Sequence, residues 1–304
     1  MIRSITAINY LGEALVLDLA RPALSGFAVK SVTGLGPAKA NINTTTVATN
    51  DGATFNFARK ESRNIVINLG FNFFTSPEEG RHITYQYFPV KQPITLVIET
   101  DERLGLINGY VESNEPDIFS KDEGCSISII CPDPNFYMAD GGGVQSVIFS
   151  GMVGEFEFPF ENNSLTEDLI EFGTVLNKAD NIINYEGDAE IGITITMHAT
   201  GTVDNITIYN ANTREIMKLN TTKLASLTGS TMIAGDDIII TTTKNSKSAT
   251  LLRQGKTTNI LNCIERPISW FTLSKGQNIF AYTAETGSSN LDFKIEFNTI
   301  YEGM

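Results

Sequence analysis

Regular alternation of apolar and polar residues in one stretch of the chain most strongly limits how it can fold. Apolar side chains occupy every second position of this stretch, at Ile65, Ile67, Leu69, Phe71 and Phe73. Because side chains of a β-strand point alternately to its two faces, the pattern predicts a strand with one face in a core and the other toward solvent. A half-buried strand of this kind is typical of antiparallel sheets.

Several other stretches carry the signature of strands. Alternating apolar residues recur at Phe156, Phe158 and Phe160, at Ile191, Ile193, Ile195 and Met197, and at Leu291, Phe293, Ile295 and Phe297. Continuous runs of β-forming residues lie at 94–99, 127–130, 206–209 and 238–243. Clusters of Gly, Asn and Asp separate these runs, and such spacing is typical of β-sandwiches and jelly rolls.

Two segments predict helices in this strand-rich chain. Ser76 and Glu79 form a capping box around a proline at the first helical position, and this helix should end before Pro89. A shorter helical turn is expected over Thr222–Leu227, ended by Gly229. The chain should therefore be mainly β.

The length of 304 residues is enough for two domains of ordinary size. Two prolines within 132–134 stiffen the chain, and three glycines at 141–143 then provide a flexible break. The first domain should be a β-sandwich with one packed helix and the second an all-β jelly roll. The expected bounds are 1–140 for the N-terminal domain, 141–150 for a linker and 151–304 for the C-terminal domain.

The composition argues against nucleic-acid binding and membrane insertion. With 22 Lys and Arg against 35 Asp and Glu, the net charge of -13 should repel a phosphate backbone. The N-terminal segment does not look like a signal peptide, and no apolar run approaches the roughly 18 residues that span a bilayer. Cys125, Cys131 and Cys263 are an odd set without zinc-site spacing, which favours buried thiols in a reducing cytoplasm.

Residues able to catalyse hydrolysis form no recognisable motif. His82 falls in the predicted helix and His198 on the polar face of a predicted strand, so both should be solvated. A glycosidase needs two carboxylates that face one cleft. The candidate pairs are Glu155 with Glu157, Asp236 with Asp237, and Glu186 with Asp188. No spacing signal supports any pair, so the sequence favours a protein without catalytic residues.

Cofactor and metal sites are equally unsupported. The stretch Gly34–Ala40 resembles a phosphate loop only superficially, because Pro37 removes an amide that would bind phosphate, and a tight turn is expected instead. The acidic residues lack the spacing of a calcium loop. The Asn- and Thr-rich stretch Asn41–Asn50 should be a loop, or an edge that pairs with a neighbouring subunit.

Four aromatic residues in the second half of the chain allow two interpretations: Trp270, Phe271, Phe280 and Tyr282. They could form a sugar-stacking platform, as in jelly-roll lectins, or they could fill the core of the domain. Core packing is favoured. A carbohydrate-binding module for cell-wall glycans remains the alternative function.

Ordered motifs along the chain resemble those of siphophage distal tail proteins. The N-terminal signature comprises Lys30–Ala40 and Asp51–Asn56. Further stretches follow in the family's order: Arg63–Phe71, Tyr87–Val90, Glu99–Arg103, Gly109–Ser120 and Ile129–Pro134. The second half, from Glu155–Phe160 through Trp270 to Tyr301–Gly303, is similar to members from phages and prophages of Gram-positive bacteria.

This resemblance implies a structural protein of the virion tail tip, assembled in the host bacterial cytoplasm, without enzymatic activity, cofactor or metal. It implies a hexameric ring with N-terminal domains around a central DNA channel. The C-terminal domains, similar to galectins or carbohydrate-binding modules, would project outward. The implied partners are the major tail tube protein, the tape-measure protein, the tail-tip lysin or spike hub protein, and the receptor-binding protein for host adsorption.

Overall fold

The computed structural model describes residues 1–46, 51–74, 76–117, 123–139, 144–148, 150–153, 174–177 and 180–304, with the backbone alone for 150–153, 174–177 and 180–181. By its internal contacts the chain divides into two units. Unit 1 comprises Met1–Gly143 together with Ile300–Met304, and unit 2 comprises Val144–Thr299. The residues Ile300–Met304, which the sequence analysis assigned to the C-terminal domain, thus pack with the N-terminal one.

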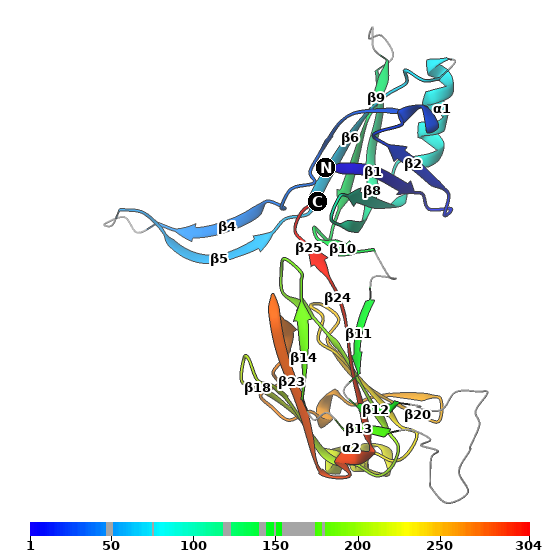
Figure 1. Ribbon diagram of the computed structural model, residues 1–304. Coiled ribbons are helices and arrows are strands. Elements are labelled where there is room, and N and C mark those ends of the chain that lie inside the picture. The colour runs from blue at the N-terminus through cyan, green and yellow to red at the C-terminus, as the bar shows by residue number, and fades with distance from the viewer. Residues whose placement is uncertain are drawn as a thin grey trace, which may run out of the picture. The chain divides into compact units, whose positions relative to one another are not determined.

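Unit 1 is built on one nine-stranded sheet and a separate hairpin (Figure 1). The sheet contains β1 (Ile2–Ile8), β2 (Ala14–Asp18), β3 (Ala28–Thr33), β6 (Arg63–Gly70), β7 (Pro93–Thr100), β8 (Leu104–Asp117), β9 (Gly124–Cys131), β10 (Phe136–Met138) and β25 (Ile300–Tyr301). The hairpin contains β4 (Ala40–Thr45) and β5 (Thr54–Lys60), and a short 3-10 helix spans Pro22–Leu24. The antiparallel path runs β2-β1-β7-β8-β9-β6-β3, and β10 pairs with both β8 and β25.

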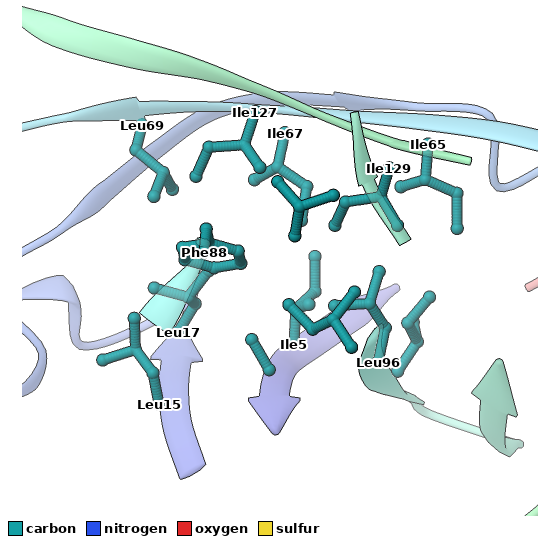
Figure 2. Packing of buried hydrophobic residues seen from close by; sticks show 14 of the residues in the cluster. Ile5, Leu15, Leu17, Ile65, Ile67, Leu69, Phe88, Leu96, Ile127 and Ile129 are labelled. Atoms are coloured by element: carbon teal, nitrogen blue, oxygen red, sulfur yellow. The ribbon is translucent and has the colours of Figure 1, made fainter. Parts of the chain in front are cut away.

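The sheet of unit 1 curls so that its two halves face each other across a core. Figure 2 shows side chains from β6 and β9 on one side, side chains from β1, β2 and β7 on the other, and Phe88 between them. The first set is Ile65, Ile67, Leu69, Ile127 and Ile129, and the second is Ile5, Leu15, Leu17 and Leu96. This two-layered packing confirms the expected β-sandwich.

The alternation of apolar and polar residues predicted over 65–73 is confirmed for β6 but ends before Phe73. Ile65, Ile67, Leu69 and Phe71 are all buried, and β6 pairs with β3 on one side and β9 on the other. Phe73, predicted to share their face, is 49% exposed. The strand ends at Gly70 and the chain then turns, so the period-two pattern no longer applies at residue 73.

The longer of the two described α-helices begins and ends where its sequence signals predict. Helix α1 (Pro77–Tyr87) has Ser76 as its N-cap, and the Ser76 hydroxyl accepts a hydrogen bond from the Glu79 amide. The helix stops one residue before Phe88, which enters the core of unit 1. Its packing against β8 and β9 supplies the single packed helix that was expected in this unit.

Unit 2 contains two larger sheets, ordered β11-β24-β16-β19-β20-β21 and β14-β23-β17-β18. Their strands are β11 (Val144–Ile148), β14 (Asp180–Tyr185), β16 (Thr194–Ala199), β17 (Asp204–Asn210), β18 (Glu215–Leu219), β19 (Asp237–Thr241), β20 (Ser248–Arg253), β21 (Lys256–Asn259), β23 (Gly276–Thr286) and β24 (Leu291–Asn298). Two small pairs join β12 (Ser150–Val153) to β13 (Thr174–Asn177) and β15 (Ile191–Gly192) to β22 (Thr272–Leu273). Short 3-10 helices span Leu261–Cys263 and Ser288–Asn290.

Aromatic contacts join the two larger sheets of unit 2 face to face. Tyr282 of β23 stacks on Phe293 of β24, with ring centroids 4.9 Å apart, and Tyr185 of β14 meets Phe297 of β24 edge-on at 6.0 Å. The alternating residues predicted on β16 and β24 point into this core. Helix α2 (Thr221–Thr228) is capped at its C-terminus by Gly229 in the left-handed conformation, as expected. The unit is jelly-roll-like.

Some sequence expectations fall outside the described residues. They concern the alternation at Phe156, Phe158 and Phe160, the glycines at 141–143, and the Glu155 and Glu157 pair. The strand expected at 156–160 and the flexible break at 141–143 stay predictions, whereas Val144–Ile148, which the expected linker 141–150 also included, form β11 and pair with β24.

A substitution in β6 tests whether the two faces of this strand differ as the core requires. Replacing Ile67, which is fully buried, with Ala should lower the free energy of unfolding by about 2–5 kcal/mol, because it leaves a cavity between the layers. Replacing its half-buried neighbour Val66 with Ala should cost about 1 kcal/mol or less. Denaturant unfolding followed by circular dichroism measures both; equal losses would contradict the assigned facing.

Candidate functional site

The most unusual surface of unit 1 is the hairpin of β4 and β5, which we call the arm. Every residue of both strands is exposed, and Figure 1 shows the hairpin standing clear of the sheet. A lone two-stranded hairpin is at best marginally stable in water. The arm is therefore a pair of strands that its own unit leaves uncovered.

A β-bulge sorts the side chains of the arm onto two unlike faces. Ile42 lies opposite Ala58, whereas the register shifts between Asn43 and Thr44 so that Thr44 lies opposite Phe55. Because opposed residues share a face, the shift brings Phe55 onto the same face as Ile42 and Ala58. Ile42 and Phe55 are each 61% exposed. This face, which we call the apolar face, is therefore hydrophobic and exposed to solvent.

The opposite face of the arm is mostly polar and is stiffened by side-chain hydrogen bonds. Asn41 lies opposite Arg59, and Asn43 lies opposite Phe57. The Asn56 amide donates to Asn43 Oδ1 at 2.8 Å and to Thr45 Oγ1 at 2.7 Å. The polar composition that predicted a loop or an edge strand thus forms one face of an extended hairpin.

The base of the arm is held by Arg63, the first residue of β6. Arg63 is 4% exposed, and its guanidinium lies 4.5 Å from the centre of the Phe136 ring. Nε donates to the Pro134 carbonyl at 2.8 Å, and Nη1 donates to the carbonyls of Gly34 and Gly36. Burial lowers the pKa of Arg63 from its ordinary value. The turn expected at 34–40 therefore accepts hydrogen bonds from the buried guanidinium of Arg63.

Gly34 is required in this turn by conformation and by space. Its φ is +84°, a region that favours glycine, and a Cβ atom there would lie 2.0 Å from the carbonyl oxygen of Asn64. The close approach lets the Gly34 carbonyl reach Arg63. Sequence reasoning singled out these glycines but assigned no role to Arg63, because an isolated arginine in a strand carries no signal of burial.

The two histidines contact carboxylates and are solvent-accessible. His82 on α1 is 72% exposed and lies 3.8 Å from Glu78, and His198 on β16 is 44% exposed and lies 2.7 Å from Asp237. The partner of each imidazole is thus an acid and not a hydroxyl or thiol nucleophile. Both histidines are solvated as predicted.

Three of the acidic residues considered for glycosidase chemistry make ion pairs, whereas Glu186 is exposed. Asp236 is 1% exposed and receives Nε and Nη2 of Arg253 at 2.8 and 2.5 Å, whereas the adjacent Asp237 contacts His198. Asp188 lies 3.7 Å from Lys275. Asp236 and Asp237 therefore do not act together on one cleft.

The aromatic residues proposed as a sugar platform are mostly core residues. Phe271, Phe280 and Tyr282 are buried, and the Tyr282 hydroxyl donates to the Leu291 carbonyl at 3.2 Å. Only Trp270 keeps partial exposure, and the Lys247 ammonium lies 5.3 Å from the centre of its ring. The core interpretation is confirmed for the first three.

Metal binding and membrane spanning have no support in the described part of the chain. The described residues hold no cluster of three or more His, Cys, Asp or Glu side chains suited to a metal ion. Neither described helix is long and apolar enough to cross a membrane.

The three cysteines are free and buried, as predicted. Burial raises the pKa of Cys125 to about 12 and that of Cys131 to about 11, since it disfavours the thiolate. Both lie on β9, in the core of unit 1.

These raised pKa values predict a loss of stability at alkaline pH. As the pH rises above the ordinary thiol value of 9.0, thiols of the unfolded chain ionise while Cys125 and Cys131 stay protonated in the folded chain. The stabilisation is complete below that pH and is lost as the pH rises toward the folded values, by up to ~1.4 kcal/mol per pH unit for each thiol. Urea unfolding at about pH 8 and about pH 10 measures it. Cys125→Ala with Cys131→Ala should flatten the dependence; an unchanged slope would contradict the assignment.

Comparison with solved structures shows which known fold this chain has. No protein-family model and no curated protein matches the chain. Among solved structures, the crystal structure of the Dit protein of phage SPP1 matches with a TM-score of 0.61 at 13% identity, covering 97% of this chain and 98% of that one. This chain has the fold of the SPP1 Dit protein. The SPP1 protein is described as a paradigm of the hub adsorption apparatus in phages that infect Gram-positive bacteria.

The matched region includes both units, since it covers 97% of this chain. Two chains from the baseplate of phage P2, in its activated conformation with Ca or with Sr, were also found. They cover 98% of this chain and 99% of theirs, at 13% and 12% identity and with TM-scores of 0.44 and 0.41.

Proposed function

We propose that this chain is a distal tail protein that forms a hexameric ring between the tail tube and the tail tip of a phage. The arm is the observation that carries the proposal. It exposes an apolar face that its own unit does not cover, on a hairpin too small to be stable alone. A neighbouring subunit is the partner that would cover this face in a ring.

The open sheet of unit 1 supports a head-to-tail arrangement. A closed ring built by head-to-tail contacts needs two different complementary surfaces on each subunit. The sheet has unlike edges, β2 and β3, and the chain continues from β3 into the arm. The arm would supply one surface, and the receiving surface on the next subunit would be a different part of unit 1.

The charge of the chain fits a channel through which DNA passes. A net charge of -13 gives a ring of six subunits a strongly acidic character. Acidic walls would repel the phosphate backbone, whereas lysine and arginine contacts would retain it. The ring would then conduct DNA without binding a specific sequence.

Unit 2 would act as a docking platform without catalytic residues, cofactor or metal. Its partners would be the tail-tip lysin or spike hub protein and the receptor-binding protein, whereas the tube and tape-measure proteins would meet the ring itself. The protein would then be located in the virion tail tip after assembly in the host cytoplasm. The buried positions of Phe271, Phe280 and Tyr282 favour this role over sugar stacking.

Substitutions on the two faces of the arm test the ring contact. Phe55→Asp should abolish ring assembly, because a carboxylate on the apolar face would be buried without a partner in the interface. Asn41→Asp on the polar face, opposite Arg59, should leave assembly intact. Light scattering gives the mass of each variant, and circular dichroism checks that both stay folded. Rings formed equally well by Phe55→Asp would contradict the role of the apolar face.

A further inference from the structure

Both legs of the arm are fastened to Ile300–Met304, which we call the return segment. We propose that the return segment sets the direction in which the arm leaves the sheet. The interface of the arm would thus be positioned by residues that follow unit 2 in the chain. The inference rests on the proposed function only for what the arm contacts, and the positioning itself is a property of the single chain.

The return segment is firmly attached to unit 1. Its strand β25 pairs with β10, where Tyr301 lies opposite Phe136 and Ile300 opposite Tyr137. Ile300 is 4% exposed, and the guanidinium of Arg103 lies 4.4 Å from the centre of the Tyr301 ring. A segment held in this way can serve as a fixed point for another part of the fold.

The leg that enters the arm is bound to this fixed point through the turn before β4. The Met304 amide donates to the Leu35 carbonyl at 3.0 Å. Gly303 approaches the same turn so closely that a Cβ atom would lie 3.1 Å from the Leu35 oxygen. Arg63 completes the link, because Nη2 donates to the Glu302 carbonyl at 2.6 Å while Nη1 holds the turn.

The leg that leaves the arm is bound through its last residue, Lys60. Its ammonium lies 2.6 Å from Oε1 of Glu302 and 3.3 Å from Oδ1 of Asn135. Both side chains of the ion pair are 37% exposed, so the pair should add little to the stability of the fold. Its position at the end of β5 gives it a directional role instead.

A small rotation at the base of the arm produces a larger displacement at its far end. A strand advances about 3.3 Å per residue, so the seven residues of β5 carry the far end of the arm roughly 20 Å from Lys60. A modest rotation at the base would therefore move Phe55, five residues along β5 from Lys60, by several times the shift at the base itself. The apolar face would then miss the surface that receives it.

The test measures the direction of the arm in the full chain. Spin labels on Thr54→Cys in the arm and Glu78→Cys on α1 report one distance; the three native thiols are buried and should not react. Labelled chain is diluted into unlabelled chain so that only distances within one subunit are seen. Glu302→Lys, which opposes Lys60, should broaden the narrow distribution of the parent. Exchanging the charges, with Lys60→Glu and Glu302→Lys together, should narrow it again.

Two comparisons make the result decisive. Glu115→Lys makes the same charge change at an exposed residue of β8 and should keep the narrow distribution. Lys60→Glu alone should broaden the distribution even if Glu302→Lys fails to fold. An unchanged distribution in both single variants would overturn the inference, whether or not rings form. Broadening in the single variants that the charge exchange reverses would support the inference even if electron microscopy found no rings. An absence of rings would count against the proposed function alone.

Discussion

The buried guanidinium of Arg63 is the contact on which the organisation of unit 1 depends. Burying a cation costs several kcal/mol, and here four carbonyl oxygens and the face of Phe136 offset that cost. The carbonyls come from the turn before the arm, the segment after β9 and the return segment. One side chain therefore joins three stretches of chain that are far apart in sequence. Hydrogen bonds to a charged group contribute about 1.5–3 kcal/mol each, and they counteract the loss of hydration of the guanidinium.

The contacts around Arg63 also hold unit 1 together, although unit 2 interrupts it in the sequence. Unit 2 is inserted between β10 and β25, which pair with each other, so unit 1 closes across the insertion. The arm is then anchored by residues on both sides of unit 2. Changes within unit 2 that leave β10 and β25 paired would not reach the base of the arm. In the proposed ring, unit 2 could therefore vary while the contact made by the arm stays constant.

Local patterns predicted much of the fold, and long-range contacts accounted for what was missed. The alternation from Ile65 to Phe71, the Ser76 cap and the Gly229 terminator depend on neighbouring residues, and each appears in the structure as predicted. The prediction that Phe73 shares the buried face was wrong, because nothing in the alternating pattern marks the end of β6 at Gly70.

The candidate site was only partly predictable, for the same reason. Its polar composition indicated a loop or an edge strand, but the bulge that brings Phe55 onto the face of Ile42 depends on the register of two strands. The burial of Arg63 and the attachment of Glu302 depend on segments more than 200 residues apart, which no local pattern could reveal.

Negative-stain electron microscopy of the concentrated full chain tests the central claim most directly. The account predicts rings of six subunits with an open centre, each subunit having the 33.2 kDa mass of this chain. Particles that remain single subunits at every concentration, and that do not assemble when tail tube protein or a tail-tip partner is added, would contradict it.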